Sequence, residues 1–160
     1  MRFIHYTLAI FALILTACSG EPTTDKAIIG TWVQETPTSM TARGLQTTTT
    51  DTVLRIKKNG VTHLTRNLDI LGEGLPADGV KLSIELRGIW EITDDKLKQT
   101  QNSALVIPRD SNETSATWAD RLQDQAAGGH PSFKTILLAD KEQLILQDLQ
   151  TGTTDTYRRK

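Results

Sequence analysis

Two histidines of the chain have neighbours that could take part in chemistry. His130 lies two residues before Ser132 and follows Asp124, so the three could form a base, a nucleophile and an orienting acid. Their spacing matches no known catalytic motif, and a histidine in a loop after a helix is the simpler interpretation. His63 and Asp69 are candidate metal ligands, but a metal site needs a closer cluster of ligands. We therefore predict no enzyme activity, no metal site and no cofactor.

A further group of polar side chains lies within the alternating segment 80–93. Glu85, Arg87 and Glu91 could line a cavity, or they could form cross-strand ion pairs on a solvated outer face, which we favour. Trp90 could contact a ligand, but an inward tryptophan more often belongs to a core. No glycine-rich loop follows a strand and opens a helix, so nucleotide binding is not predicted.

The alternation itself predicts one long strand from Val80 to Thr93. Apolar side chains occupy even positions and polar ones odd positions, which separates them onto the two faces of a strand. Gly88 and Ile89 interrupt the pattern, and Gly88 is expected to mark a bend. The apolar residues are Val80, Leu82, Ile84, Leu86, Trp90 and Ile92.

The first residues have the pattern of an export signal. Met1 and Arg2 precede a short apolar run, which is too short to span a bilayer and ends in Thr16-Ala17-Cys18. The stretch 15–18 resembles the lipobox of bacterial lipoproteins. The resemblance implies a signal peptide over 1–17 and lipid on Cys18, through which the protein would bind a membrane. Cys18 is the single cysteine of the chain, so a free thiol or an intermolecular disulfide is the alternative.

The same resemblance implies a location. In bacterial lipoproteins, retention at the inner membrane is associated with Asp after the lipidated cysteine, and this chain has Ser19 there. We therefore expect a protein of the cell envelope, anchored to the outer membrane and facing the periplasm.

The charge of the exported part excludes one class of partner. Residues 18–160 carry 17 Lys and Arg side chains against 19 Asp and Glu side chains, with no basic stripe. The basic end at 158–160 is interpreted as a solvated terminus, and no nucleic acid partner is predicted. The polar segment 18–27 reads as a lipidated tether, and 28–160 is long enough for one domain with its own core.

Short turns join most of the expected strands. Asn59-Gly60 and 140–142 are hairpin signals, 71–79 is a glycine-rich loop, and 36–52 is a threonine-rich mobile loop that grades into a polar strand. One short amphipathic helix over 117–127 follows a possible capping box at 110–113. About eight strands with short connections predict an all-β protein with one short helix, as an eight-stranded antiparallel up-and-down β-barrel.

Three short motifs resemble the small bacterial lipocalin-like lipoproteins. They are Gly30-Thr31-Trp32, Gly88-Ile89-Trp90 and the closing hairpin from 144 to 158. The resemblance implies a barrel closed at one end by Trp32, with Arg158 or Arg159 stacked on its indole. The helix differs from that of classical lipocalins, because it precedes the last three strands instead of following the barrel.

These observations predict a lipid-anchored binding module for a small, mostly apolar ligand, with the threonine-rich segment as a lid. The alternative is a solid barrel whose loops, 36–51 and 71–79, contact an envelope protein or inhibit an enzyme. The expected pocket residues are Leu54, Ile56, Leu82, Ile84, Leu86 and Leu146.

Overall fold

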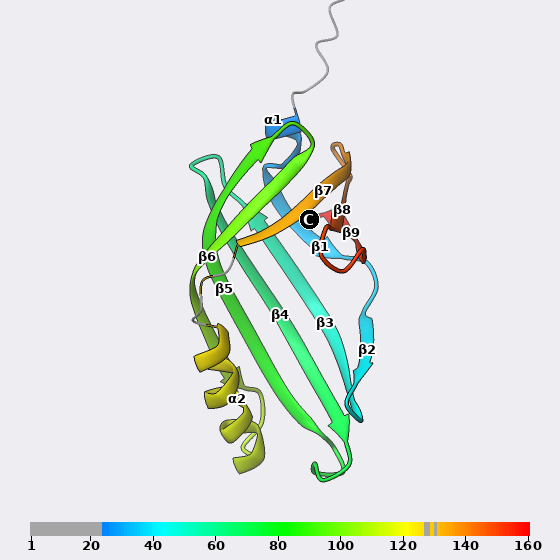
Figure 1. The fold of residues 1–160 in the computed structure, drawn as a ribbon, viewed down its shortest axis with the longest axis vertical. Coiled ribbons are helices and arrows are strands. Elements are labelled where there is room, and N and C mark those ends of the chain that lie inside the picture. The colour runs from blue at the N-terminus through cyan, green and yellow to red at the C-terminus, as the bar shows by residue number, and fades with distance from the viewer. Residues whose placement is uncertain (1–23, 127–128, 130) are drawn as a thin grey trace, which may run out of the picture.

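The computed structural model describes residues 24–126, 129 and 131–160. This part of the chain forms nine strands and two helices (Figure 1). In chain order they are α1 (Thr24–Ile28), β1 (Gly30–Gln34), β2 (Thr38–Ala42), β3 (Leu45–Ile56), β4 (Val61–Gly72), β5 (Val80–Thr93), β6 (Lys96–Pro108), α2 (Glu113–Ala126), β7 (Pro131–Ala139), β8 (Gln143–Asp148) and β9 (Thr154–Arg159).

Eight of these strands close into an antiparallel barrel. Closure occurs at β1, which pairs with β9 on one side and with the second half of β3 on the other. Strand β2 lies outside the ring and pairs with the first half of β3. The predicted eight-stranded antiparallel barrel is confirmed, and it is compatible with a lipocalin-like fold.

The long strand predicted over 80–93 is β5, with the same bounds. It pairs with β4 on one side and with β6 on the other, and its register against β6 shifts between Arg87 and Gly88. A Cβ atom on Gly88 would lie 2.2 Å from the carbonyl oxygen of Thr100. Gly88 therefore permits the close approach of β6 at this bulge, where the sequence predicts a bend.

Unequal strand lengths divide the molecule into two halves. Strands β3 to β6 have 12 to 14 residues, whereas β7 to β9 have 6 to 9. The ring is therefore complete in the upper half of Figure 1, and the long strands continue below it as an open sheet. Helix α2 packs against β5 and β6 in this lower half.

Each half has its own apolar core. The core at the closed end surrounds Trp32, and the second core lies where α2 meets the long strands. The closed-end core contains Ile28, Trp32, Leu54, Ile56, Leu97, Leu144, Leu146 and Tyr157. The second core contains Ile70, Val80, Leu82, Val106 and Ala119, with Trp118 and Leu122 of α2 packed against it.

Helix α2 confirms the predicted helix but begins four residues earlier than expected. Its N-terminal cap is Asn112, whose side-chain oxygen accepts a hydrogen bond of 2.9 Å from the backbone N–H of Thr114. Asp110, the first residue of the expected capping box, instead accepts a 3.1 Å bond from the backbone N–H of Asn112.

Two other expectations about local structure hold only in part. The polar strand expected at the end of segment 36–52 is present in β3, but the rest of the segment is not a loop, because β2 and β3 form a hairpin there with Arg43 and Gly44 at positive φ. Threonine favours extended backbone, which explains a strand with few apolar residues. The β-rich start expected at 28 is the end of helix α1, in which Ala27 and Ile28 are buried.

Candidate functional site

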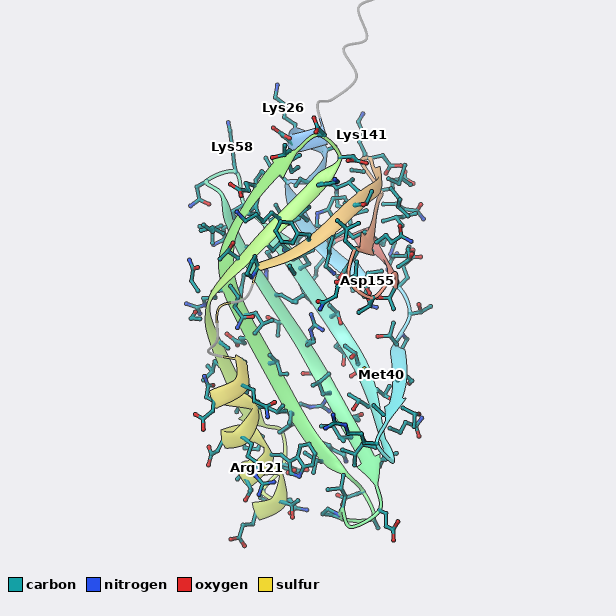
Figure 2. All side chains as sticks on the ribbon, in the orientation of Figure 1. Lys26, Met40, Lys58, Arg121, Lys141 and Asp155 are labelled. Atoms are coloured by element: carbon teal, nitrogen blue, oxygen red, sulfur yellow. The ribbon has the colours of Figure 1, made fainter. Side chains whose placement is uncertain are left out.

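A cavity of about 500 Å³ lies inside the barrel between the two apolar cores. This volume falls within the range of about 300–1,000 Å³ that is typical of small-molecule sites. Threonines and charged side chains dominate its lining, and the large apolar side chains among the lining residues are Met40, Leu64 and Leu86. In Figure 2, Met40 of β2 and Asp155 of β9, both lining residues, lie on the same side of the molecule.

Arg66 brings a positive charge into this cavity from the middle of β4. It lies at an inward position of the strand, between Leu64, which packs on the closed-end core, and Leu68, which packs on the second core. The Nε atom of Arg66 is buried and has no hydrogen-bond partner among the described residues. The side chain therefore presents a cation between two inward-facing leucines.

Lys134 and Asp155 form an ion pair in the cavity wall. The Nζ atom of Lys134 in β7 lies 3.0 Å from a carboxylate oxygen of Asp155 in β9, and the two side chains are 15% and 25% exposed. Both residues line the cavity. Because the two charges compensate each other, the pair adds hydrogen-bonding groups to the wall but little net charge.

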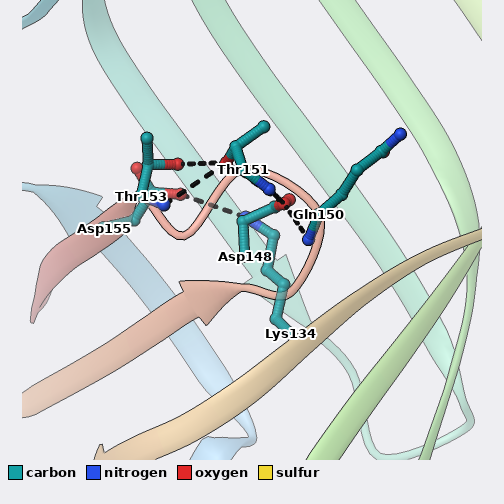
Figure 3. Close-up of polar contacts among 6 residues, drawn as sticks. All are labelled: Lys134, Asp148, Gln150, Thr151, Thr153 and Asp155. Carbon is teal, nitrogen blue, oxygen red and sulfur yellow. Dashed lines mark hydrogen bonds and ion pairs between the residues drawn. The ribbon is translucent and has the colours of Figure 1, made fainter.

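Asp148 has a structural role at the cavity wall (Figure 3). Its carboxylate accepts hydrogen bonds from the backbone N–H groups of Gln150 and Thr151, at 2.9 and 2.8 Å. These bonds lower the pKa of Asp148 below its ordinary value, and the bond from Thr151 has the largest effect. The hydroxyl of Thr151 also bonds to the hydroxyl of Thr153, at 2.7 Å. The carboxylate thus shapes the β8–β9 turn.

Tyr157 borders the charged groups from the side of the closed-end core. Burial raises the pKa of its hydroxyl, and the negative charge of Asp155 raises it further. The positive charge of Arg66 acts in the opposite direction. Tyr157 is uncharged at neutral pH, as an ordinary tyrosine is, and both Arg66 and Asp155 interact electrostatically with its hydroxyl.

The structure divides the six residues that were expected to form an apolar pocket. Leu54, Ile56 and Leu146 are packed in the closed-end core. Leu82 belongs to the second core, against which Ile84 packs. Leu86 is the one member of the set that lines the cavity. The predicted lid, now the β2–β3 hairpin, contributes lining residues 38–40 and 49.

The structure does not bring His63 and Asp69 together. They lie six residues apart on β4, where His63 faces Glu85 at 3.5 Å and Asp69 faces Arg109 at 3.2 Å. Six residues of strand correspond to about 20 Å. In the part of the chain that the structure describes, no group of three or more His, Cys, Asp or Glu side chains could hold a metal ion.

The proposed nucleophile set can be placed only in part. His130 and the predicted lipidation site Cys18 lie outside the described residues. Ser132 lines the cavity, and Asp124 is exposed on α2.

One charged side chain of β5 forms the favoured kind of ion pair across the strands, because Glu91 pairs with Lys98 of β6. Glu85 lies 3.9 Å from Arg87 of the same strand and 3.5 Å from His63 of β4. Arg87, at the bulge, is 67% exposed and also contributes to the cavity lining.

Trp90 belongs to the core, as the simpler interpretation held. It packs on the closed-end core, and its indole N–H donates to the carbonyl of Lys57 at 2.9 Å.

The barrel is closed by Trp32 and Arg159. Of the two arginines considered, Arg159 lies 4.1 Å from the centre of the Trp32 ring, whereas Arg158 is exposed. Its terminal nitrogens donate to the carbonyls of residues 27 and 29, at 2.8 and 2.9 Å, and to that of residue 140 at 3.2 Å. A Cβ atom on Gly30 would lie 2.4 Å from one of these nitrogens, so a side chain at this position would displace the guanidinium of Arg159.

Sequence reasoning missed Arg66, Lys134 and Asp155 as cavity residues. A signal for Arg66 was present, because it interrupts the inward series Thr62, Leu64, Leu68 and Ile70 of β4. No such signal marks Lys134 and Asp155, which come together only through the pairing of β7, β8 and β9.

No family model and no curated protein matches this chain. No helix among residues 24–126 and 131–160 is long and apolar enough to cross a membrane.

Proposed function

We propose that this protein binds a small molecule in the barrel cavity and does not catalyse a reaction. A closed β-barrel is consistent with such a binding module. The observation that carries the proposal is the cavity of about 500 Å³, whose wall combines an unpaired arginine, an ion pair, hydroxyl groups and three apolar side chains.

The character of the wall changes the expected ligand. Five of the six apolar residues first assigned to the pocket fill the two cores instead. The remaining lining offers many polar groups that a purely apolar ligand would leave unpaired, at a cost in affinity. The proposed ligand therefore has polar as well as apolar groups.

The proposal includes a lipid anchor on Cys18 and a place at the outer membrane facing the periplasm. Its support is the sequence pattern of an apolar run followed by Thr16-Ala17-Cys18 and Ser19. Acyl chains contribute about 0.8 kcal/mol for each buried methylene, so an anchor of several chains needs no membrane contact from the barrel.

Native mass spectrometry of the protein purified gently from its own host tests cavity binding. We expect an additional mass that is lost on denaturation. In Ser132→Trp, a bulky ring enters the cavity wall and should exclude the ligand. The neighbouring Phe133→Trp is the matched control, because Phe133 is 45% exposed and is not a lining residue. A protein free of ligand, even after incubation with host extract, would contradict the proposal.

The anchor is tested separately with Cys18→Ser. We expect the wild-type protein to carry a lipid mass and to sediment with outer membranes, and the variant to lose both properties. Equal sedimentation of the two proteins without a lipid mass would contradict the anchor and leave cavity binding untouched.

A further inference from the structure

We infer that the cavity selects small organic anions and that Arg66 binds their negatively charged oxygen atoms. This inference rests on the proposed function and specifies its ligand class. The ligand would place a carboxylate, phosphate or sulfonate group on Arg66 and its apolar part against Leu64 and Leu86, which line the same cavity.

The first argument is the unused hydrogen-bonding capacity of Arg66. A guanidinium has five N–H donors and stays protonated at any physiological pH. Among the described residues, Arg66 makes no side-chain hydrogen bond and no ion pair within 4.0 Å, and its Nε atom is buried without a partner. The Nε atom of Arg159 is also unpaired, but the terminal nitrogens of Arg159 donate three hydrogen bonds. Buried donors are normally satisfied, so this group calls for an acceptor that enters the cavity.

The second argument is a second unpaired polar group near Arg66. The register of β3 against β4 shifts between Thr50 and Val53, directly opposite Arg66. Thr52, within this bulge, is 3% exposed, and its hydroxyl also has no partner among the described residues. β-Bulges are over-represented at barrel rims and next to active sites, so the position of this bulge beside Arg66 supports a site there.

The third argument is the local balance of charge. The two acidic residues of the lining are already engaged, Asp155 with Lys134 and Asp148 with the β8–β9 turn. Tyr157 lies close enough to be affected by the charge of Arg66 but supplies no negative charge, because a tyrosine is neutral at physiological pH and burial raises its pKa further. The charge of Arg66 is therefore uncompensated, and charge-assisted bonds to an anion are about twice as strong as neutral ones.

Two fluorescent probes with the same ring system test this inference. Anilinonaphthalene sulfonate is an anion, and phenylnaphthylamine is its neutral counterpart without the sulfonate. Binding is measured on the full chain carrying Cys18→Ser, which removes the predicted lipid and the need for detergent. We expect Arg66→Gln to weaken sulfonate binding about tenfold or more, with little change for the neutral probe.

Three variants in the same background provide the controls. Arg121→Gln removes a positive charge from the exposed surface of α2 (Figure 2) and should leave both affinities unchanged. Ser132→Trp should weaken both probes, which places them in the cavity. Arg66→Lys keeps the charge but loses the planar fork, and should retain an intermediate preference for the sulfonate.

The outcomes separate this inference from the proposed function. If neither probe binds, both are overturned for ligands of this size. If both bind in the cavity but Arg66→Gln leaves the sulfonate affinity unchanged, only the selection of anions is overturned. Circular dichroism checks the fold of each variant. If Arg66→Gln does not fold, added salt should weaken binding of the sulfonate and not of the neutral probe, and equal salt responses would overturn the inference.

Discussion

The two interior arginines of the barrel each have a buried Nε atom without a partner among the described residues, but their terminal nitrogens differ. Arg159 stacks on Trp32, and its terminal nitrogens donate three hydrogen bonds to carbonyl groups at the closed end. Arg66 lies in the cavity and donates no hydrogen bond to the described residues. The first arginine is therefore committed to the fold, whereas the second is available to a ligand.

This difference extends to the regions around the two arginines. At the closed end, Trp32, Leu144 and Leu146 are fully buried and leave no space for another molecule. Around Arg66, threonine and glutamine side chains replace the apolar ones and leave the cavity open. The barrel thus keeps its stability and its proposed binding in separate layers, so substitutions in one layer should leave the other unaffected.

Trp32→Ala should have the largest effect on the free energy of unfolding. Trp32 is 0% exposed and stacks on Arg159, and removal of a buried tryptophan side chain costs about 3–5 kcal/mol. Urea denaturation of the Cys18→Ser chain measures the loss. Trp118 on α2 is only half-buried, so Trp118→Ala should lower the free energy of unfolding by less. An equal or larger loss would contradict the leading role of the closed end.

Arg159→Gln should have the second-largest effect, with a loss of about 2–3 kcal/mol in the free energy of unfolding. The substitution removes the cation over Trp32 and the donors to three backbone carbonyls. Arg158→Gln is the matched control, because Arg158 is the exposed neighbour, and it should change the stability by about 0.5 kcal/mol or less. Equal losses in the two variants would show that Arg159 does not secure the closed end.

The sequence predicts the barrel well because local signals agree along most of the chain. The alternation in 80–93 and the Asn59-Gly60 turn each specify one element, and the structure contains both as expected. The β2–β3 hairpin escapes prediction because its threonines are extended without being apolar. Its strands are recognisable only from the pairing of residues 38–42 with 45–49.

The site is harder to predict because apolar alternation does not distinguish a filled layer from an open one. Leu54 and Leu86 both lie on inward faces, yet the first is packed in a core and the second faces the cavity. The distinction depends on where β7 to β9 end relative to the longer strands, and this is a property of the register. A cation within an inward series, as at Arg66, is the one local sign of the open layer.

Gln123→Leu, in the lower half of the molecule, should lower the free energy of unfolding by a smaller amount. Strand β6 pairs with β7 only over 96–100, and beyond this point the side-chain amide of Gln123 takes the place of a neighbouring strand. It accepts from the backbone N–H of Val106 at 2.9 Å and donates to the carbonyl of Ala104 at 2.8 Å. The variant should lose about 1–2 kcal/mol in urea denaturation.

The same variant should also expose the edge of β6 to other chains, which light scattering would detect as association. Gln125→Leu is the control, because Gln125 is exposed on the same helix. A monomeric Gln123→Leu variant of unchanged stability would show that the amide does not protect this edge.

Asp148→Asn should have the smallest effect, and this effect should depend on pH. Hydrogen bonds from the β8–β9 turn lower the pKa of Asp148 in the folded protein relative to the unfolded chain, where it is about 3.9. The charged carboxylate therefore stabilises the fold above this value, and its contribution disappears as the pH falls through the lower, folded pKa. Urea denaturation should show a difference between wild type and variant at pH 7 that narrows below about pH 4.

Asp140→Asn allows the β8–β9 turn at the cavity to be compared with the β7–β8 turn at the closed end. Backbone N–H groups of Gln143 and Glu142 lower the pKa of Asp140 in the same way, but in the β7–β8 turn, away from the cavity lining. For both variants, the difference in stability from wild type should disappear over the same acidic pH range. Only Asp148→Asn should alter binding of the sulfonate probe. A difference that stays constant down to pH 3 would contradict the role of the Asp148 charge in the turn. An equal change in probe binding in both variants would contradict the separation of the closed end from the cavity.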